Sequence, residues 1–210
     1  MVLTVVARRG VWRLRKLMEN PPNPITIGIL LFDDVEILDF CGPYEVFSVT
    51  KTLEGTPAFN IFTIAEKLTI TARNGLSVNC DLNLRTAPNL DILLLPGGQG
   101  TRKEIDNPVL MDWIQQQIEP TPLVLSVCTG ALFLAKAGKL AGLRATTHAN
   151  GYDVLAKLSP DTELSRDRIV DNGKFILSAG IDMSFHVVAK LLGDAAALQA
   201  AEYMEYDWRP

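Results

Sequence analysis

The chain lacks an apolar run long enough to cross a membrane, and it lacks an excess of positive charge. Its longest charge-free run of interest, residues 120–135, is shorter than the roughly 18 apolar residues that a membrane helix needs, and it contains Pro, Thr, Ser and Gly. The 210 residues hold 20 Lys and Arg against 24 Asp and Glu, which gives a formal net charge of −4. We therefore expect neither a membrane nor nucleic acid as a partner.

Cysteine and the common ligand-binding motifs are also scarce. Cys41, Cys80 and Cys128 are odd in number, form no C-x-x-C pair and lie far apart, which favours a reducing, cytoplasmic location over a disulfide framework. No His, Cys, Asp or Glu cluster has the spacing of a zinc or calcium site, and neither of the common phosphate-binding glycine patterns occurs. We predict no metal and no cofactor, and we expect Cys41 and Cys80 to be buried packing residues.

The composition that remains fits one folded domain with a distinct N-terminal segment. Hydrophobic residues make up 48% of the chain and charged residues 21%, near globular averages. Residues 1–20 carry five basic residues against Glu19 alone and have no apolar stretch of signal-peptide length. We expect residues 1–24 to be a basic, disordered extension or the product of an upstream start codon, with organelle targeting as the alternative. Residues 25–210 are predicted to form the domain.

Short apolar runs alternate with helix-like segments along the domain. The strand-like runs cover residues 25–32, 59–65, 91–95 and 123–127, and the helix-like segments between them cover residues 43–51, 109–118 and 129–137. Because strands that alternate with helices pair in parallel, this order predicts a parallel α/β sheet.

Two predicted hairpins and three further helices complete the pattern. The hairpins cover residues 68–80, around Asn74-Gly75, and residues 168–178, around residues 171–173. The helices cover residues 150–158, 181–192 and 194–206. Asn150 is expected to cap the first of them, and Gly193 to separate the last two.

A cysteine lies where a buried-looking strand runs directly into a helix. Residues 123–127 are apolar except for Ser126, Cys128 follows them, and Gly130 comes two residues later. A nucleophile elbow has this arrangement: a tight turn raises the side chain above the sheet, and N–H groups of the following helix favour an exposed thiolate. The alternative is a buried cysteine that only packs, but ligands bind at the carboxyl ends of strands in open α/β sheets.

Two other strand ends carry candidate site residues. Gly97 and Gly98 follow the strand of residues 91–95, and their backbone can approach a ligand closely, as in an oxyanion hole or a phosphate site. Asp39 follows the first strand and comes just before Pro43, a residue that suits the first turn of a helix. The Asp39 carboxyl could therefore face the thiol or only cap that helix.

Four motifs in order resemble the ThiJ/PfpI superfamily, whose members are related to class I glutamine amidotransferases. They are Pro96-Gly97-Gly98, Ser126-Val-Cys128-Thr-Gly130, Arg144-Ala-Thr-Thr-His148 and Ala179-Gly-Ile-Asp182, and the likeness spans residues 25 to about 206. Leu38-Asp39-Phe-Cys-Gly-Pro43 is similar to a segment of isonitrile hydratases and of the amidase-like ligand domains of AraC-type regulators.

The resemblance implies a fold and a set of site residues. The fold is a flavodoxin-like three-layer α/β sandwich with a mostly parallel central sheet and helices on both faces. Cys128 is implied as the nucleophile and Asp39 as the acidic residue in contact with it. Gly98 and the N–H of Thr129 match oxyanion-hole positions. His148 matches a histidine near the nucleophile, where it would be either a polar wall of the pocket or a structural residue.

The predicted function is that of a cysteine-dependent enzyme similar to isonitrile hydratase, acting on a small molecule as a homodimer. Cys128 would attack the terminal isonitrile carbon, Asp39 would supply a proton, and Thr129 would orient substrate or water, giving an N-substituted formamide. Two alternatives stay open. One is a ligand-sensing domain without turnover, although a chain that ends at Pro210 leaves no room for the DNA-binding domain of AraC-type regulators. The other is a glyoxalase-type enzyme that acts on aldehydes.

Overall fold

A seven-stranded, mostly parallel sheet forms the centre of the computed structural model, which describes residues 12–178 and 180–210. Its strands, in spatial order, are β10 (Ile169–Asp171), β11 (Phe175–Ser178), β7 (Leu123–Val127), β6 (Ile92–Leu95), β1 (Ile25–Leu31), β2 (Phe59–Ala65) and β5 (Leu82–Asn83). Every neighbouring pair is parallel except β10 and β11. This arrangement confirms the predicted parallel α/β sheet.

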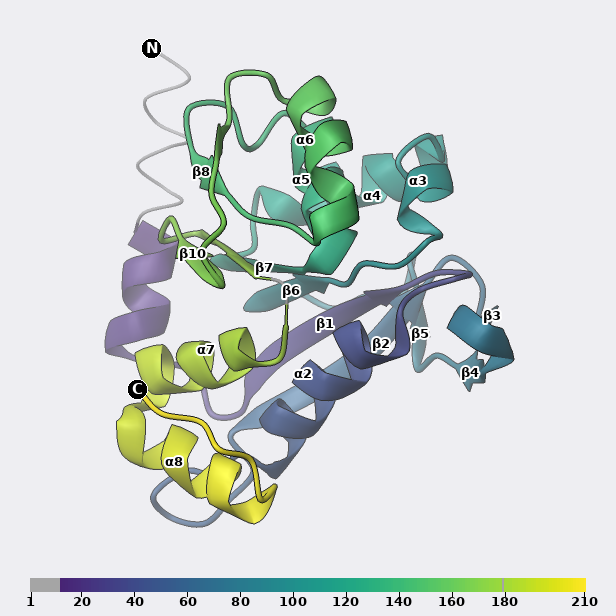
Figure 1. The fold of residues 1–210 in the computed structure, drawn as a ribbon. Helices are drawn as coiled ribbons and strands as arrows, with labels where there is room; N and C mark the ends of the chain where they lie inside the picture. The colour runs from purple at the N-terminus through teal and green to yellow at the C-terminus, as the bar shows by residue number, and fades with distance from the viewer. Residues whose placement is uncertain (1–11, 179) are drawn as a thin grey trace.

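Helices cover both faces of the sheet, as the flavodoxin-like class requires (Figure 1). On one face lie α2 (Ile37–Val49), α7 (Asp182–Leu192) and α8 (Asp194–Tyr203). On the other lie α3 (Thr101–Glu104), α4 (Pro108–Ile118), α5 (Ala131–Lys136) and α6 (Tyr152–Leu158). Two small sheets, β3 (Thr69–Thr71) with β4 (Ser77–Asn79) and β8 (Arg144–Ala145) with β9 (Glu163–Leu164), lie outside the central one.

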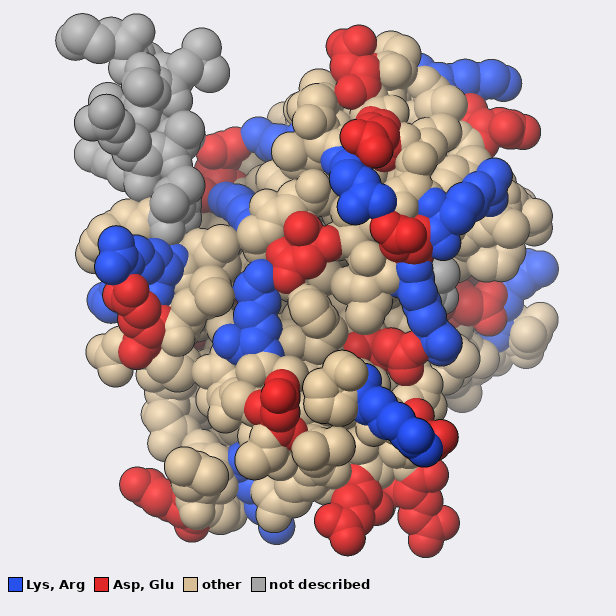
Figure 2. Space-filling view, turned by 60° about the vertical axis from the view of Figure 1, so that its left-hand side comes forward, with Lys and Arg blue, Asp and Glu red and all other residues tan. Residues whose placement is uncertain are grey.

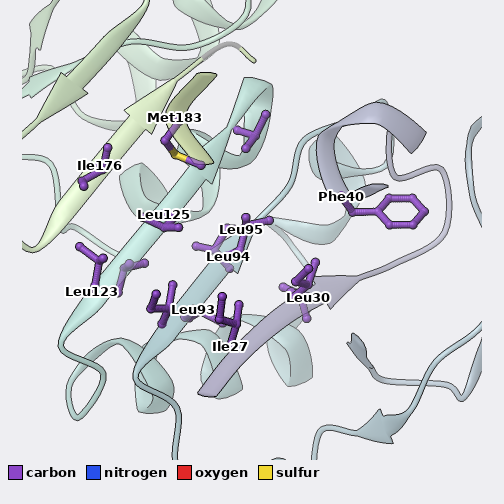
Figure 3. Close-up of a cluster of buried hydrophobic side chains, with 14 of the residues drawn as sticks. Ile27, Leu30, Phe40, Leu93, Leu94, Leu95, Leu123, Leu125, Ile176 and Met183 are labelled. Atoms are coloured by element: carbon purple, nitrogen blue, oxygen red, sulfur yellow. The ribbon is translucent and has the colours of Figure 1, made fainter. Parts of the chain in front are cut away.

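The central strands are almost wholly apolar because both of their faces are covered. Figure 3 shows side chains projecting from β1, β6, β7 and β11, among them Leu30, Leu94, Leu125 and Ile176, each of which is fully buried. A core packed in this way is rigid on average. The loops at the strand ends therefore start from fixed positions.

The first helix of the domain begins earlier than the sequence predicted. The α2 helix starts at Ile37, and Pro43, expected in its first turn, lies in its interior. Proline has no N–H, so the Asp39 carbonyl loses the helical bond that residue 43 would donate. The helix continues because Phe40, Val46 and Phe47 are buried against the rest of the core. Asp39 consequently lies within the first turn rather than before it.

Two other helix starts also differ from the prediction. Residues Ala149–Gly151 form a short 3₁₀ turn before α6, and the His148 ring, not Asn150, caps that turn by accepting the Asn150 N–H at 3.2 Å. Residues Cys128–Gly130 form another 3₁₀ turn before α5. Both predicted hairpins are present, as β3 with β4 and as β10 with β11. Gly193 separates α7 from α8 with a positive φ of 91°.

Part of the predicted disordered extension is an ordered helix. Residues 12–19 are helical, Leu17 is only 2% exposed, and the Arg13 guanidinium donates to the Pro120 carbonyl at 2.8 Å. Residues 1–11, to which the same expectation applied, lie outside the described residues, and the domain boundary itself stays a prediction. Figure 2 shows Lys and Arg interspersed with Asp and Glu on one face of the molecule. Among the helices of the described chain, none has the length and apolarity to span a bilayer.

The docking of residues 12–19 predicts the effect of truncating Leu17. Leu17→Ala should lower the free energy of unfolding by about 2–5 kcal/mol, because it removes a buried side chain and leaves a cavity. Met18→Ala is the matched control, since the neighbouring Met18 side chain is 41% exposed and should matter little. Urea unfolding measures both variants, and equal stability of Leu17→Ala and the parent would show that the helix does not dock.

Candidate functional site

The ends of three neighbouring strands bring the predicted site residues together. The order of the sheet reverses between β1 and β6, because the chain passes from β1 to β2 on one side and later returns to β6 on the other. Such a switch point is the usual place for a ligand in an open α/β sheet. Asp39 comes from the helix that follows β1, Gly97 and Gly98 follow β6, and Cys128 follows β7.

The backbone turns sharply at Cys128, as it does in a nucleophile elbow. Cys128 has a φ of 56°, a left-handed conformation that is uncommon for a residue other than glycine. The turn places Gly130 so close to β6 that a Cβ atom there would lie 1.9 Å from the Leu95 carbonyl oxygen. Glycine is therefore required at position 130, and the cysteine side chain is half-buried at the strand end rather than fully exposed as expected.

Asp39 is a buried carboxyl group in direct contact with the cysteine. Its side chain is 7% exposed, accepts the Gly97 N–H at 3.2 Å, and lies near enough to the Cys128 thiol for each group to shift the pKa of the other. Burial disfavours the carboxylate and raises the pKa of Asp39 to about 6. Since the side chain faces the thiol and makes no helix-cap bond, the interpretation of Asp39 as a helix cap is wrong.

The thiol is not converted to a thiolate by the turn alone. Burial, followed by the charge of Asp39, raises the pKa of Cys128 to about 12, although the Thr129 N–H and hydroxyl act in the opposite direction. The Thr129 N–H favours the thiolate, as expected of the N–H groups of the following helix, but burial and the charge of Asp39 outweigh it. Because two adjacent buried acids resist double ionisation, the pair carries one proton and one negative charge at neutral pH. Moving that proton from sulfur to Asp39 gives a thiolate beside a neutral acid.

The two glycines position their neighbours, and both of their N–H groups have acceptors within the protein. The Gly98 N–H donates to the Thr129 hydroxyl oxygen at 3.0 Å, and the Gly97 N–H donates to Asp39. A Cβ atom on Gly97 would lie 2.5 Å from the Thr129 nitrogen and 2.8 Å from the Asp39 carboxyl. The expected open oxyanion hole at Gly98 is thus filled by Thr129, whose own N–H faces the Cys128 sulfur.

His148 lies at the exposed rim of the site. Its neighbour Thr147 donates a hydrogen bond to the Cys128 carbonyl at 2.8 Å, which ties this segment to the elbow. His148 is near enough to Asp39 to lower the pKa of that carboxyl. His148 caps the following 3₁₀ turn and also borders the site. The two predicted roles of His148, a structural residue and a polar wall of the pocket, are therefore compatible.

Other sequence expectations have different outcomes. Cys80 is buried as expected, at 8% exposure, but Cys41 is exposed, because an α2 helix that starts at Ile37 turns it away from the core. Ala179, the first residue of the fourth motif, lies outside the described residues. Within the described part of the chain, no group of three or more His, Cys, Asp and Glu side chains could hold a metal ion.

Two buried threonines of the site were missed by the sequence analysis. Thr101 is fully buried, and its hydroxyl oxygen lies 3.1 Å from that of Thr129, while Thr147 is 3% exposed and bonds the Cys128 carbonyl. A threonine three residues after Gly98, at the start of a short helix, is a local signal for Thr101. Thr147 belongs to the third motif, directly before His148, but the sequence assigns it no role of its own.

Comparison with known proteins places this site in context. Residues 26–193 match the model of the DJ-1/PfpI family. The chain is 33% identical to isonitrile hydratase from Pseudomonas putida over 187 residues, which cover 87% of this chain and 78% of that protein. It is 25% identical to the HTH-type transcriptional regulator GbdR from Pseudomonas aeruginosa, over 88% of this chain and 52% of the regulator. A crystal structure of a ThiJ/PfpI family protein from Pseudomonas syringae matches with a TM-score of 0.80 and 27% identity, covering 90% of this chain and 77% of that one.

The buried carboxyl group predicts a gain in stability when it is neutralised. The pKa of Asp39 is higher in the folded protein than the ordinary value of about 3.9, so the stability associated with the protonated form is complete below about pH 4 and is lost as the pH rises through 6. Asp39→Asn should therefore raise the free energy of unfolding at pH 7 by up to about 3 kcal/mol and have little effect at pH 4.

Urea unfolding at the two pH values measures this difference. Asp34→Asn is the matched control, since Asp34 is an exposed carboxyl in the same connection between β1 and α2. A change in stability for Asp39→Asn that is the same at pH 4 and pH 7 would contradict the burial argument.

The shared proton predicts a pH profile for alkylation of Cys128. In a Cys41→Ser background, which removes the exposed thiol, the rate with iodoacetamide should rise through about pH 6, where the pair loses its first proton, and then level off. Asp39→Asn should abolish that step. Peptide mapping should find Cys80 unlabelled, because it is buried and burial raises its pKa to about 11. A rate that only begins to rise above pH 8, as for an ordinary thiol, would rule out the shared proton.

Proposed function

The chain belongs to the DJ-1/PfpI family, and we propose that within it the protein is a cysteine-dependent enzyme that hydrates an isonitrile to an N-substituted formamide. The observation that carries this proposal is the buried Asp39 carboxyl beside the Cys128 thiol at the switch point of the sheet. A passive binding site needs no acid of raised pKa beside a thiol, whereas proton transfer coupled to nucleophilic attack does.

The first half of the proposed reaction forms a thioimidate. Cys128 gives its proton to Asp39, and the sulfur attacks the terminal carbon of the isonitrile. Asp39 then delivers the proton to that carbon, so the product is an N-substituted thioimidate whose carbon carries one hydrogen. An acid whose pKa lies near the working pH can both accept and donate a proton. Burial raises the pKa of Asp39 into that range, to about 6.

The second half consumes water and restores the pair. Water adds to the thioimidate carbon, and one of its protons goes to the nitrogen. The tetrahedral intermediate then expels the Cys128 sulfur as its hydroxyl becomes the formamide carbonyl, and the remaining proton returns to the pair. The sum is isonitrile plus water to N-substituted formamide. The Thr129 N–H, which acts to lower the pKa of the thiol, stabilises the negative charge of the sulfur in both halves, and His148 forms a polar wall.

A second candidate function is a ligand sensor without turnover. The match to the regulator GbdR covers 88% of this chain at 25% identity, so this domain also occurs joined to transcriptional regulators. A sensor would use the same pocket for a small molecule but would need no proton movement between Asp39 and Cys128. A glyoxalase-type enzyme that acts on aldehydes would share the cysteine and differ in the walls of the pocket.

We also propose that the partners are a small-molecule substrate and a second copy of the chain, in the cytoplasm. Two apolar side chains of the α2 helix, which also carries Asp39, are exposed to solvent. Leu38 is 65% exposed and Tyr44 is 39% exposed. Exposed apolar side chains beside a catalytic group favour a covering subunit. Sedimentation equilibrium gives the oligomeric state directly.

Turnover of a small isonitrile tests the proposed enzyme. Protein treated with EDTA should convert the isonitrile to the corresponding N-formyl amine, measured by liquid chromatography and mass spectrometry. Cys128→Ala should abolish conversion, and Asp39→Asn should lower kcat by about 10²- to 10⁴-fold, the usual contribution of a general acid–base. Cys41→Ser should leave conversion unchanged, because the exposed Cys41 thiol takes no part in the chemistry.

The same assay separates the rival functions. A glyoxalase-type enzyme would consume an α-oxoaldehyde and ignore the isonitrile. A sensor would bind one of the compounds and release no product. Binding to the folded state would raise the melting temperature of the protein. Absence of turnover with isonitriles, oxoaldehydes and amides would end the enzyme proposal and leave the fold and family unaffected.

A further inference from the structure

Arg102 is a half-buried arginine that pairs with no carboxylate of the described residues. Its guanidinium makes one hydrogen bond within that part of the chain, from Nη2 to the Asn150 carbonyl at 3.2 Å. Other described arginines do form ion pairs with carboxylates, namely Arg15, Arg73, Arg144, Arg168 and Arg209. Residues 1–11 and 179, which the structure does not describe, contain no Asp or Glu. The charge of Arg102 is therefore left for a group from outside the chain.

The hydrogen bond of Arg102 joins two segments that both contact the cysteine elbow. Thr101, the preceding residue, places its hydroxyl oxygen 3.1 Å from that of Thr129. In the other segment, Gly151 follows the accepting carbonyl, and a Cβ atom there would lie 3.3 Å from the Thr129 side chain. Because Thr129 directly follows Cys128, the Arg102 guanidinium is held at the edge of the candidate site.

Acidic and basic groups reach this site from opposite faces of the sheet. Glu36 and Asp39 lie at the start of α2, on one face. Arg102 lies in α3 and His148 caps the turn before α6, and both of these helices cover the other face (Figure 1). A ligand at the thiol therefore meets carboxyl groups on its α2 side and a fixed cation on the opposite side.

The guanidinium is oriented but largely unpaired. It has five N–H donors, and the bond to the Asn150 carbonyl uses one of them. The other four are enough for the two parallel hydrogen bonds with which arginine binds a carboxylate. Because the side chain is half-buried and already tethered, such a contact would be screened less by water than one at a free surface arginine.

We propose that Arg102 is a specificity-determining residue that binds a carboxylate carried by the substrate. The inference rests on the proposed function for the reacting group and adds an acidic group to the same molecule, so the substrate class becomes isonitriles that bear a carboxylate. Attraction of an anion to Arg102 does not depend on which electrophile the thiol attacks. It can therefore be measured separately from hydration.

Two alkylating agents of similar size test the inference without any isonitrile. Iodoacetate carries a carboxylate, and iodoacetamide carries a neutral amide. The measured quantity is the ratio of their rates at Cys128, iodoacetate over iodoacetamide, in the Cys41→Ser background. Both rates scale with the same thiolate population, so a change in the pKa of the thiol leaves the ratio unchanged. Contact between opposite unit charges is worth about fivefold even in bulk water, so Arg102→Gln should lower the ratio about fivefold.

A neighbouring cation provides the matched control. Lys103 is exposed and follows Arg102 in α3, so Lys103→Gln removes the same charge from the same helix and should leave the ratio at the parent value. Arg102→Met keeps the length of the stem and should give the same fall as Arg102→Gln, which keeps the test decisive if the glutamine variant does not fold. A parent-like ratio in the Arg102 variants, or an equal fall in Lys103→Gln, would overturn the inference.

Hydration assays distinguish failure of this inference from failure of the proposed function. Isocyanoacetate and isocyanoacetamide differ in the same way as the two alkylating agents. The parent should have the higher kcat/KM for isocyanoacetate, and Arg102→Gln should lose that preference through a rise in KM. Turnover of both compounds without a preference would overturn the inference. No turnover of either, together with the expected fall in the alkylation ratio, would end the proposed function and leave the anion site in place.

Discussion

The site depends on one proton held between two buried acids. Burial raises the pKa of both Asp39 and Cys128, and the charge of Asp39 raises the pKa of Cys128 further, so only one of them is ionised at neutral pH. Nearby features serve this contact. Gly97 leaves room for Asp39 and Thr129, and Gly130 leaves room for the turn that carries Cys128. A side chain at either glycine would push apart the groups that share the proton.

The same contact has a cost in stability that the core offsets. Cys128 adopts a left-handed backbone conformation, and Asp39 is a carboxyl group at 7% exposure, both of which disfavour folding. They are tolerated at the ends of β1, β6 and β7, whose side chains are almost all fully buried. A rigid sheet fixes the three strand ends, and these two groups occupy the helical turns that follow β1 and β7. Strain located in this way is typical of functional sites.

The sequence determines the scaffold more completely than it determines the site. Apolar runs and Asn-Gly turns predicted the parallel sheet and both hairpins, because those signals are local. The start of α2 was missed, since Pro43 disfavours a helix interior and only burial of Phe40 and Phe47 overrides it. That single error placed Asp39 before the helix and Cys41 in the core. The contact between Thr101 and Thr129 was equally out of reach, because the two residues are 28 positions apart and meet only through the fold.

The scaffold alone does not decide between catalysis and ligand sensing. The chain matches both an isonitrile hydratase and a transcriptional regulator over most of its length, so the decision lies in the groups at the site rather than in the sheet. What decides is whether the proton can leave sulfur for Asp39 and whether the thiolate formed is stabilised. In this chain the buried Asp39 carboxyl lies beside the Cys128 thiol, and the N–H of Thr129 acts to lower the pKa of that thiol. The groups around the sulfur thus bear on function as directly as the nucleophile itself.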